Sequence, residues 1–231
     1  MTMFVLIHGG GDVGWSWHLV QAELEARGHR VVAPDLPADD DALTLADYAA
    51  AVVDACGPAE GRGIVVVGHS FGGFTAPLVA ERMDADALVL LAGMIPAPGE
   101  APDEWWANTG YAAAVEEQAA LDGGLTGNED PLVSFAHDVP RELALDAMSR
   151  EREHPSSASM AAVWPLDSWP QVPTHLLICR DDRFFPVAFQ RRVAAERLGV
   201  TPDEIPGSHC VMLSRPVEVA ERLIAYALPS H

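Results

Sequence analysis

The sequence predicts an α/β fold: a mainly parallel sheet of about six strands with helices on both of its faces. Short apolar runs rich in β-branched residues alternate with helix-length segments through residues 1–93, and again after residue 170. A serine flanked by glycines, at 68–72, directly follows one of these runs. The length of 231 residues and the hydrophobic content of 49% fit one domain with a substantial core.

Four strands and three helices are predicted in the first 93 residues. Ser16 is the expected cap of the first helix and Gly28 its stop, and Thr44 is the expected cap of the second. Pro77 lies inside the third helix and should kink it. The strands are expected at 4–7, 30–33, 64–67 and 87–92, and the helices at about 16–27, 44–56 and 71–83.

The alternation of strands and helices stops after Gly93. Residues 94–170 hold prolines, glycines and most of the aromatic residues, with helical patches and no clear strand. We predict that this segment is a small helical cap, inserted into a core of residues 1–93 and 171–231 within a single domain. The alternation then resumes, with strands at 174–179 and 203–205 and helices at about 187–198 and 216–228.

The stretch Gly68-His69-Ser70-Phe71-Gly72 joins the third strand to the third helix. A G-x-S-x-G sequence in this position is typical of a nucleophile elbow, in which the serine occupies a very tight turn. Because Gly68 and Gly72 lack a Cβ atom, strand and helix can approach closely and Ser70 can adopt strained backbone angles. The Ser70 hydroxyl is therefore the predicted nucleophile, standing clear of the sheet edge.

A base is needed as well, since a serine hydroxyl is a weak nucleophile at neutral pH. The usual base is a histidine that a carboxylate orients. Two later strands run into loops with such residues: Asp181 and Asp182 follow 174–179, and His209 follows 203–205. Both loops lie at the sheet edge where Ser70 is expected, so His209 is the predicted base. Asp182 is favoured over Asp181 as its partner because it lies deeper in the loop.

The loop His8-Gly9-Gly10-Gly11, after the first strand, can supply donors to a developing oxyanion. The expected donors are the backbone N–H groups of Gly10 and of Phe71, the residue after the nucleophile.

The same loop formally matches a dinucleotide-binding pattern, G-x-G-x-x-G at 9–14, with Asp35 at about the right distance. The alternative is thus an NAD(P)-binding oxidoreductase. Trp15 and Trp17 count against it, because they are bulky where the helix must pack tightly on its strand. Asp35 also lies within a Pro-Asp-Leu-Pro turn, and the serine elbow would have no role.

Composition excludes several classes of protein. The formal charge of −20 disfavours nucleic acid and anionic membranes as partners. All basic residues are arginines, so Schiff-base lysines, Ser-Lys dyads and Walker-type phosphate loops are excluded. Three widely spaced cysteines suggest neither a disulfide framework nor a zinc site. No stretch has membrane-spanning length and no secretory signal is evident, so a soluble cytoplasmic monomer or homodimer without cofactor is expected.

Four stretches resemble the α/β-hydrolase superfamily, and more closely its branch of plant methyl-salicylate esterases and hydroxynitrile lyases. They are HGGGDVGWSW at 8–17, GHSFGG at 68–73, DRFFPVAFQ at 182–190 and SHCVML at 208–213. The similarity covers most of the chain and is weakest in the cap. It implies the α/β-hydrolase fold, a cap that lines a mostly apolar acyl pocket, and these roles: nucleophile Ser70, orienting carboxylate Asp182, base His209, and oxyanion donors Gly10 and Phe71.

The lyases of that branch have a lysine directly after the histidine and a threonine in the first loop, where this chain has Cys210 and Gly10. Without a cation to stabilise a leaving cyanide, an esterase is favoured over a lyase. A receptor-like role is a further alternative by fold analogy. The predicted function is hydrolysis of a small ester with an aromatic or apolar portion. Candidate substrate contacts are Trp106, Phe135, His137 and Phe184. His137 lies beside Asp138 in the cap, and it could instead have a structural role.

Overall fold

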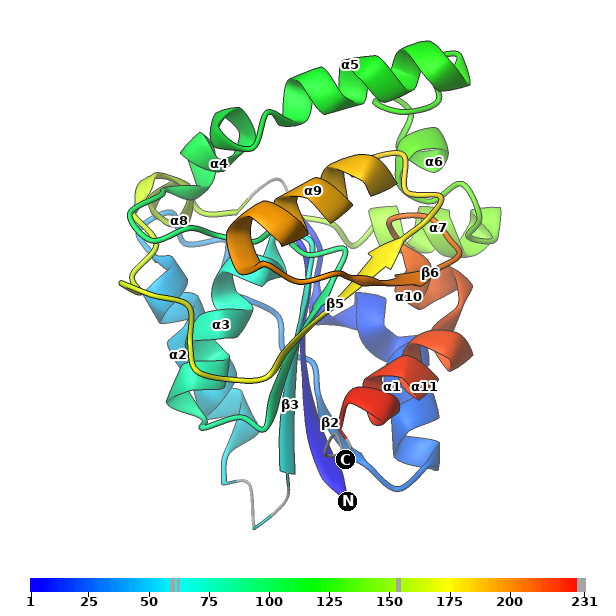
Figure 1. Cartoon of the computed structure of the whole chain (residues 1–231). Helices are drawn as coiled ribbons and strands as arrows, with labels where there is room; N and C mark the ends of the chain where they lie inside the picture. Colours follow the sequence, from blue (N-terminus) through cyan, green and yellow to red (C-terminus); the bar gives the residue numbers. More distant parts are fainter. Residues whose placement is uncertain (59–60, 62, 153–154, 228–231) are drawn as a thin grey trace.

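A computed structural model describes residues 1–58, 61, 63–152 and 155–227, and these residues form one sheet of six parallel strands (Figure 1). The strand order is β2-β1-β3-β4-β5-β6. This confirms the predicted fold class and places each strand within about two residues of its expected position. The strands are β1 (Thr2–Ile7), β2 (Arg30–Val32), β3 (Gly63–His69), β4 (Ala87–Leu91), β5 (Thr174–Cys179) and β6 (Asp203–Ile205).

The central strands are apolar on both faces because helices cover both. Val5 and Val66 pack into one hydrophobic cluster, whereas Phe4 and Val67 pack into another on the opposite face. Helices α2 (Leu45–Cys56), α3 (Gly72–Arg82) and α9 (Val187–Leu198) supply the first cluster. Helices α1 (His18–Ala26), α10 (Val211–Ser214) and α11 (Pro216–Tyr226) supply the second. Figure 1 shows α2 and α3 on one side of the sheet and α1 and α11 on the other.

The helices differ from the prediction in two places. Ser16 does not cap a helix: it lies inside a 3₁₀ turn, Gly14–Trp17, where its buried hydroxyl donates to the carbonyl of Val13, so α1 begins only at His18. The short helix α10 was not expected. The predicted end of the last helix, near residue 228, lies outside the described residues. The predicted cap Thr44 is confirmed, and its N–H and hydroxyl both donate to Asp47.

The described residues between β4 and β5 form five helices and no strand. Figure 1 shows α4, α5 and α6 above the end of the sheet toward which β5 points. The helices are α4 (Pro102–Asn108), α5 (Tyr111–Asp122), α6 (Pro131–Ser134), α7 (Arg141–Met148) and α8 (Ser157–Ala161). The boundaries of the cap at 94 and 170 stay predictions.

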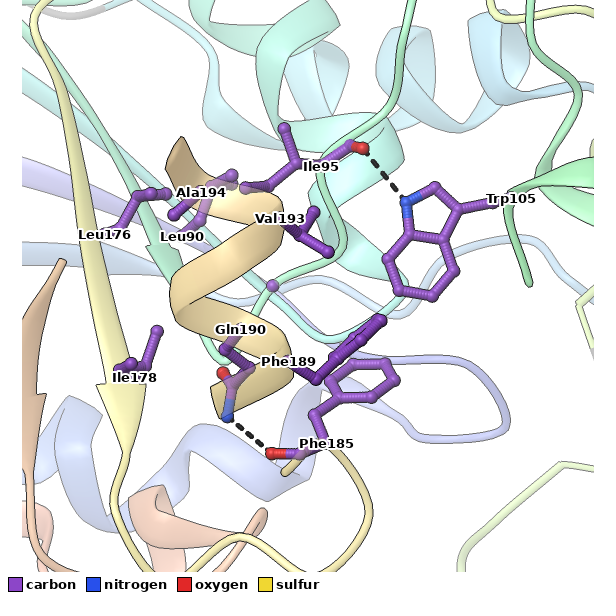
Figure 2. A pocket seen from close by; sticks show the side chains of 11 residues that line it. Leu90, Ile95, Trp105, Leu176, Ile178, Phe185, Phe189, Gln190, Val193 and Ala194 are labelled. Atoms are coloured by element: carbon purple, nitrogen blue, oxygen red, sulfur yellow. Dashed lines mark hydrogen bonds between the residues drawn. The ribbon is translucent and has the colours of Figure 1, made fainter. Parts of the chain in front are cut away.

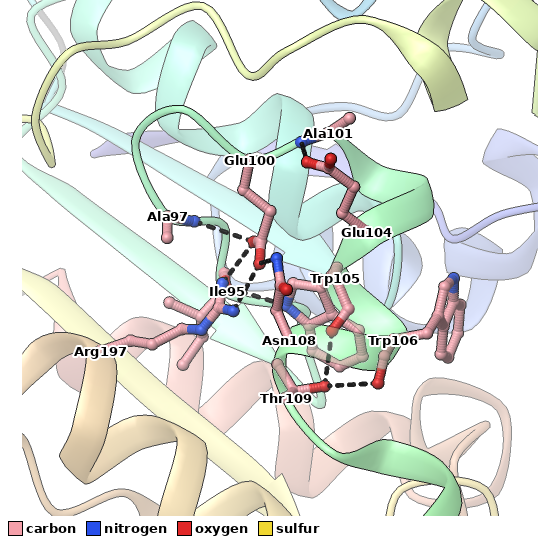
Figure 3. Close-up of polar contacts among 10 residues, drawn as sticks. All are labelled: Ile95, Ala97, Glu100, Ala101, Glu104, Trp105, Trp106, Asn108, Thr109 and Arg197. Atoms are coloured by element: carbon pink, nitrogen blue, oxygen red, sulfur yellow. Dashed lines mark hydrogen bonds and ion pairs between the residues drawn. The ribbon is translucent and has the colours of Figure 1, made fainter.

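A buried ion pair joins the start of this inserted segment to α9 (Figure 3). The two guanidinium nitrogens of Arg197 lie 2.5 and 2.7 Å from the two carboxylate oxygens of Glu100, whose side chain is only 5% exposed. Burial alone would raise the pKa of Glu100, but hydrogen bonds from Arg197 and Asn108 lower it below its usual value. Arg197 and Trp105 both donate to the carbonyl of Ile95, so α4 is held against the core.

A small apolar cavity of about 20 Å³ lies beneath α9 (Figure 2). The amide of Gln190 donates to the carbonyl of Phe185 at its edge, 2.7 Å away. The cavity is about large enough for one water molecule, and none of the predicted catalytic residues lines it. Its lining is Leu90, Gly93, Ile95, Trp105, Leu176, Ile178, Phe185, Phe189, Gln190, Val193 and Ala194. No helix of the described residues is both long and apolar enough to cross a membrane.

Candidate active site

Ser70 occupies a strained turn between β3 and α3. Its φ of +49° is in the left-handed region, which non-glycine residues rarely adopt. A Cβ on Gly68 would lie 2.7 Å from both the Cβ of Ala76 and the carbonyl oxygen of Gly72, and one on Gly72 would lie 2.6 Å from the carbonyl oxygen of His8. The two glycines of the motif are therefore required by the close approach of helix, strand and neighbouring loop.

Hydrogen bonds to the end of β4 hold this turn in place. The N–H of Ser70 donates to the carbonyl of Leu91 at 3.3 Å. The carbonyl of Ser70 accepts from the N–H groups of Gly73 and Met94 at 3.0 and 2.9 Å. With its backbone fixed on both sides, Ser70 is 9% exposed and its side chain borders a cavity.

The cavity opens where the direction of the sheet reverses. From β1 the chain passes to β2 on one side and then to β3 on the other, which leaves a crevice beyond the carboxyl ends of β1 and β3. A Cβ on Gly9 would lie 3.1 Å from the Cβ of Ser70, and one on Gly10 would lie 3.3 Å from the Cβ of Phe71. The N–H groups of Gly10 and Phe71 donate to no other described residue. The two predicted oxyanion donors thus lie side by side, and neither N–H group is hydrogen-bonded to another described residue.

His8 fixes the shape of this first loop. Its Nε2 accepts from the N–H of Leu36 at 2.9 Å, so the ring proton is on Nδ1, which lies 2.8 Å from the carbonyl oxygen of Gly9. Burial lowers the pKa of His8, which keeps the ring neutral. This neutral histidine, with both ring nitrogens hydrogen-bonded, connects the first loop to the segment that follows β2.

Asp182, and not Asp181, contacts His209. The Nδ1 of His209 lies 2.8 Å from the Oδ2 of Asp182, and the two residues are 2% and 4% exposed. The Oδ1 of Asp182 accepts from the N–H groups of Phe184 and Phe185, both at 2.8 Å. The carboxylate of Asp181 instead accepts from the N–H of Gly207. The loop after β5 thus points its second aspartate inward to His209.

The other ring nitrogen of His209, Nε2, is buried and makes no hydrogen bond with Ser70 or with any other described residue. His209 nevertheless borders the same cavity as Ser70. His69 supports its backbone, because its Nε2 donates to the carbonyl of His209 at 3.0 Å. Burial lowers the pKa of His69 well below its usual value, so this ring is neutral as well.

Ser70 and His209 share a cavity of about 180 Å³. Six of its lining residues, all apolar, come from α6, α7 and the segment that joins them. Two acidic residues, Asp12 and Glu151, also line it, and sequence reasoning missed both. The full lining is Gly9, Gly10, Asp12, His69, Ser70, Pro131, Phe135, Ala136, Ala144, Ala147, Met148, Glu151, His209, Cys210 and Leu213.

Of the four candidate substrate contacts, only Phe135 lines the cavity. Phe184 lies behind it, with its ring stacked on Phe135 at 4.3 Å and 5.0 Å from the ring of His209. Trp106 packs in an aromatic cluster against Tyr111. His137 donates from Nε2 to the carbonyl of Asp181, outside the cavity. The structure therefore does not bring Trp106 or His137 to the site.

The glycines and aspartate of the dinucleotide pattern have structural partners. The Oδ1 of Asp35 accepts from the N–H of Gly14 at 2.8 Å, and its Oδ2 lies 3.1 Å from a guanidinium nitrogen of Arg152. A Cβ on Gly14 would overlap the carbonyl oxygen of Ala33, so packing accounts for this glycine. Among the described residues, no group of three or more His, Cys, Asp or Glu is placed to hold a metal ion.

Comparison with known proteins agrees with the fold. The sequence profile of the Alpha/beta hydrolase family matches residues 4–222. The chain is 29% identical to a pyrethroid hydrolase of Sphingobium wenxiniae over 98% of this chain and 88% of that protein. It is also 29% identical to salicylic acid-binding protein 2 of Nicotiana tabacum, over 97% of this chain and 96% of that protein. The crystal structure of polyneuridine aldehyde esterase superposes with a TM-score of 0.77 at 23% identity, covering 97% of this chain and 98% of that one.

The profile match spans nearly the whole chain, and the solved structure shares its fold from end to end. The resemblance drawn from the four sequence stretches is confirmed. From its sequence and its fold together, the chain belongs to the alpha/beta hydrolase family.

Proposed function

We propose that the protein is a serine carboxylesterase acting on a small ester with an apolar or aromatic portion, through Ser70, His209 and Asp182. The observation that carries the proposal is the 2.8 Å contact of His209 with Asp182, on a ring whose other nitrogen is unpaired and borders the same cavity as Ser70. In structures without substrate, catalytic hydrogen bonds are often long and tighten only when substrate binds. The missing Ser70–His209 hydrogen bond is compatible with that behaviour.

In the proposed reaction, the hydroxyl oxygen of Ser70 attacks the ester carbonyl while Nε2 of His209 takes the hydroxyl proton. Asp182 stabilises the imidazolium that forms. The N–H groups of Gly10 and Phe71 donate to the carbonyl oxygen as it becomes negative. Such a donor typically contributes about 10²–10³ in rate. The imidazolium then protonates the leaving alcohol, and a water molecule, deprotonated by His209, cleaves the acyl–serine bond and regenerates the hydroxyl.

The size and lining of the cavity support a small, largely apolar substrate. Its volume of about 180 Å³ is below the roughly 300–1,000 Å³ of pockets for drug-sized ligands. Phe135, Ala144, Met148 and Leu213 supply apolar surface near the reacting groups. The names of the relatives, a pyrethroid hydrolase and a salicylic acid-binding protein, refer to compounds with aromatic or apolar parts.

Cys210 supports hydrolysis over cyanohydrin cleavage. It occupies the position where lyases of the related branch have a lysine, and it lines the cavity. Burial raises the pKa of its thiol well above the usual value, so the side chain is neutral. A neutral thiol cannot supply the positive charge that a leaving cyanide would need.

The test is a pre-steady-state assay with p-nitrophenyl acetate. The wild type should release a burst of about one p-nitrophenol per protein, because acylation precedes slower deacylation. Ser70→Ala should show no burst, whereas Ser157→Ala, a change of an exposed serine on α8, should behave like the wild type. Equal turnover by Ser70→Ala and the wild type would refute the proposal. Intact-protein mass spectrometry should detect the acetyl group on the wild type and on Ser157→Ala, but not on Ser70→Ala.

A further inference from the structure

Two carboxylates line the cavity that holds Ser70 and His209. Asp12 lies in the loop after β1, and Glu151 lies just beyond the end of α7, so the fold brings them to one cavity from distant parts of the sequence. No arginine is among the lining residues, and the chain has no lysine. The charged part of the cavity wall is therefore entirely negative.

Neither carboxylate has a cationic partner in the described part of the chain. The Oδ1 of Asp12 accepts from a neutral group, the N–H of Val13, at 2.8 Å. The two arginines next to Glu151 in sequence are engaged elsewhere: Arg150 contacts Asp146, and the guanidinium of Arg152 contacts Asp35 and Asp39. Among the described residues, no salt bridge compensates the charges of Asp12 and Glu151.

The two groups also act on each other. Asp12 is half-buried, and Glu151 is exposed where the cavity meets the surface. Partial burial raises the pKa of both carboxyl groups, and the charge of Asp12 raises that of Glu151 further. Two acids that disfavour each other's ionisation gain most from a counterion placed between them, since an opposite charge within about 4–6 Å favours both charged forms.

Two other features of the cavity point to a bound molecule. The Nε2 of His209 is a buried polar atom with no hydrogen-bond partner among the described residues, in a residue that is 2% exposed and lines the cavity. The ring of Phe135 lines the same wall and can attract a cation through its π face. Outside the cavity, the net charge of −20 attracts cations toward the molecule in general.

We propose that this cavity selects esters that carry an ammonium group, with Asp12 and Glu151 binding the cation while Ser70 reacts with the carbonyl. The proposal rests on the esterase function proposed above and names its substrate class. Esters that carry a carboxylate in place of the ammonium group would be rejected, since they would bring a third negative charge into the cavity.

The experiment compares acetylcholine with 3,3-dimethylbutyl acetate, an uncharged ester of nearly the same shape. We expect kcat/KM to be at least about tenfold higher for the cation. Glu151→Gln and Asp12→Asn should each reduce this preference several-fold. Glu221→Gln, which removes the same charge from the exposed face of α11, should leave it unchanged. The proposal would be overturned if the two esters had about equal kcat/KM. It would also be overturned if Glu221→Gln lowered the preference for acetylcholine as much as Glu151→Gln.

Binding without turnover separates this proposal from the esterase proposal. Choline and 3,3-dimethylbutan-1-ol are titrated into Ser70→Ala protein by calorimetry. Choline should bind at least about tenfold more tightly, and the difference should shrink in Ser70→Ala/Glu151→Gln. Hydrolysis of the neutral ester with no choline preference in either assay would overturn the cation site and leave the esterase standing. Choline preference in the titration, without a burst from any ester, would refute the esterase and leave the cation site.

Discussion

The Oδ2 of Asp182 lies 2.8 Å from the Nδ1 of His209, while the Oδ1 of the same carboxylate accepts from two backbone N–H groups of its own loop. Both oxygens of the carboxylate are therefore committed. The carboxylate cannot flip without breaking the two hydrogen bonds that it accepts from the N–H groups of Phe184 and Phe185. This arrangement fixes the tautomer of His209: Nδ1 carries the proton, and Nε2 is left as the basic atom.

Asp182→Asn should lower kcat by about 10⁴ with little change in KM. The amide oxygen must stay on the Phe184 and Phe185 N–H groups, so the amide NH₂ faces Nδ1 of His209. Nδ1 then has to accept, the proton moves to Nε2, and the base is lost; a loss of about this size is known for the equivalent change in a serine protease. Asp181→Asn is the matched control, with steady-state ester hydrolysis as the measurement. Equal losses in the two variants would contradict this assignment.

Gly73→Ala should destabilise the fold by at least about 3 kcal/mol, because the new Cβ would overlap the carbonyl oxygen of Met94 in a rigid loop. The control is Gly199→Ala, where φ is +67° but the space around the Cβ is empty. That variant should lose only about 1–2 kcal/mol, the cost of the left-handed conformation. Urea denaturation measures the free energy of unfolding of both variants. A smaller loss for Gly73→Ala than for Gly199→Ala would show that the elbow packs less tightly than described.

Glu100→Gln should cost about 3–5 kcal/mol, because it leaves the guanidinium of Arg197 buried without its counterion. The control is Glu23→Gln, which breaks an ion pair with Arg27 whose side chains are each 33% exposed. An exposed pair of this kind contributes about 0.3–0.5 kcal/mol. Thermal unfolding separates the two, and limited proteolysis of Glu100→Gln should give its first cuts near α4. Similar losses in both variants would contradict the role given to burial.

The free energy of unfolding should fall as the pH is lowered from 7.5 to 5.5. Burial lowers the pKa of His8 and His69 in the folded protein, whereas in the unfolded chain both titrate near 6.5. Below about pH 6.5 the unfolded chain therefore binds protons that the folded protein does not, and stability is lost. Asp12 and Glu151 have raised pKa values in the folded protein, so their protonation stabilises the fold as the pH falls. The contribution of a histidine is therefore measured as the difference between the wild type and a variant that lacks it.

That difference is measured between the wild type and His69→Gln, in which the amide can still donate to the carbonyl of His209. The dependence on pH should be shallower in the variant, by up to about 1.4 kcal/mol per pH unit below 6.5. Parallel curves for the two proteins would show that His69 does not stay neutral in the folded state.

Local patterns predicted the strands and most helices because burial on both faces requires continuous apolar runs. The run at Val65, Val66 and Val67 is an example, since all three are at most 1% exposed. Prediction was wrong at Ser16, because its residue type favours a cap while the tertiary packing of Trp17 in the core favours a 3₁₀ turn. The four-residue helix α10 is too short for a periodic signal.

At the site, the residues at strand ends could be predicted, because parallel strands bring their carboxyl ends to one edge. Asp12 had a signal that could have been used, an acidic residue in the same first loop as Gly10. Glu151 had none, because the path of the inserted helices follows no pattern that sequence alone reveals. The same lack of pattern placed Trp106 and His137 among the candidate contacts, although the fold turns them away from the cavity.

Both outer strands of the sheet, β2 and β6, have only three residues each. β6 carries two acidic residues, Asp203 and Glu204, and β2 begins with an arginine. Short, charged borders give a strand of another chain little backbone to pair with. We therefore expect that two copies of this protein, if they associate, do so through helical surfaces and not by continuing the sheet.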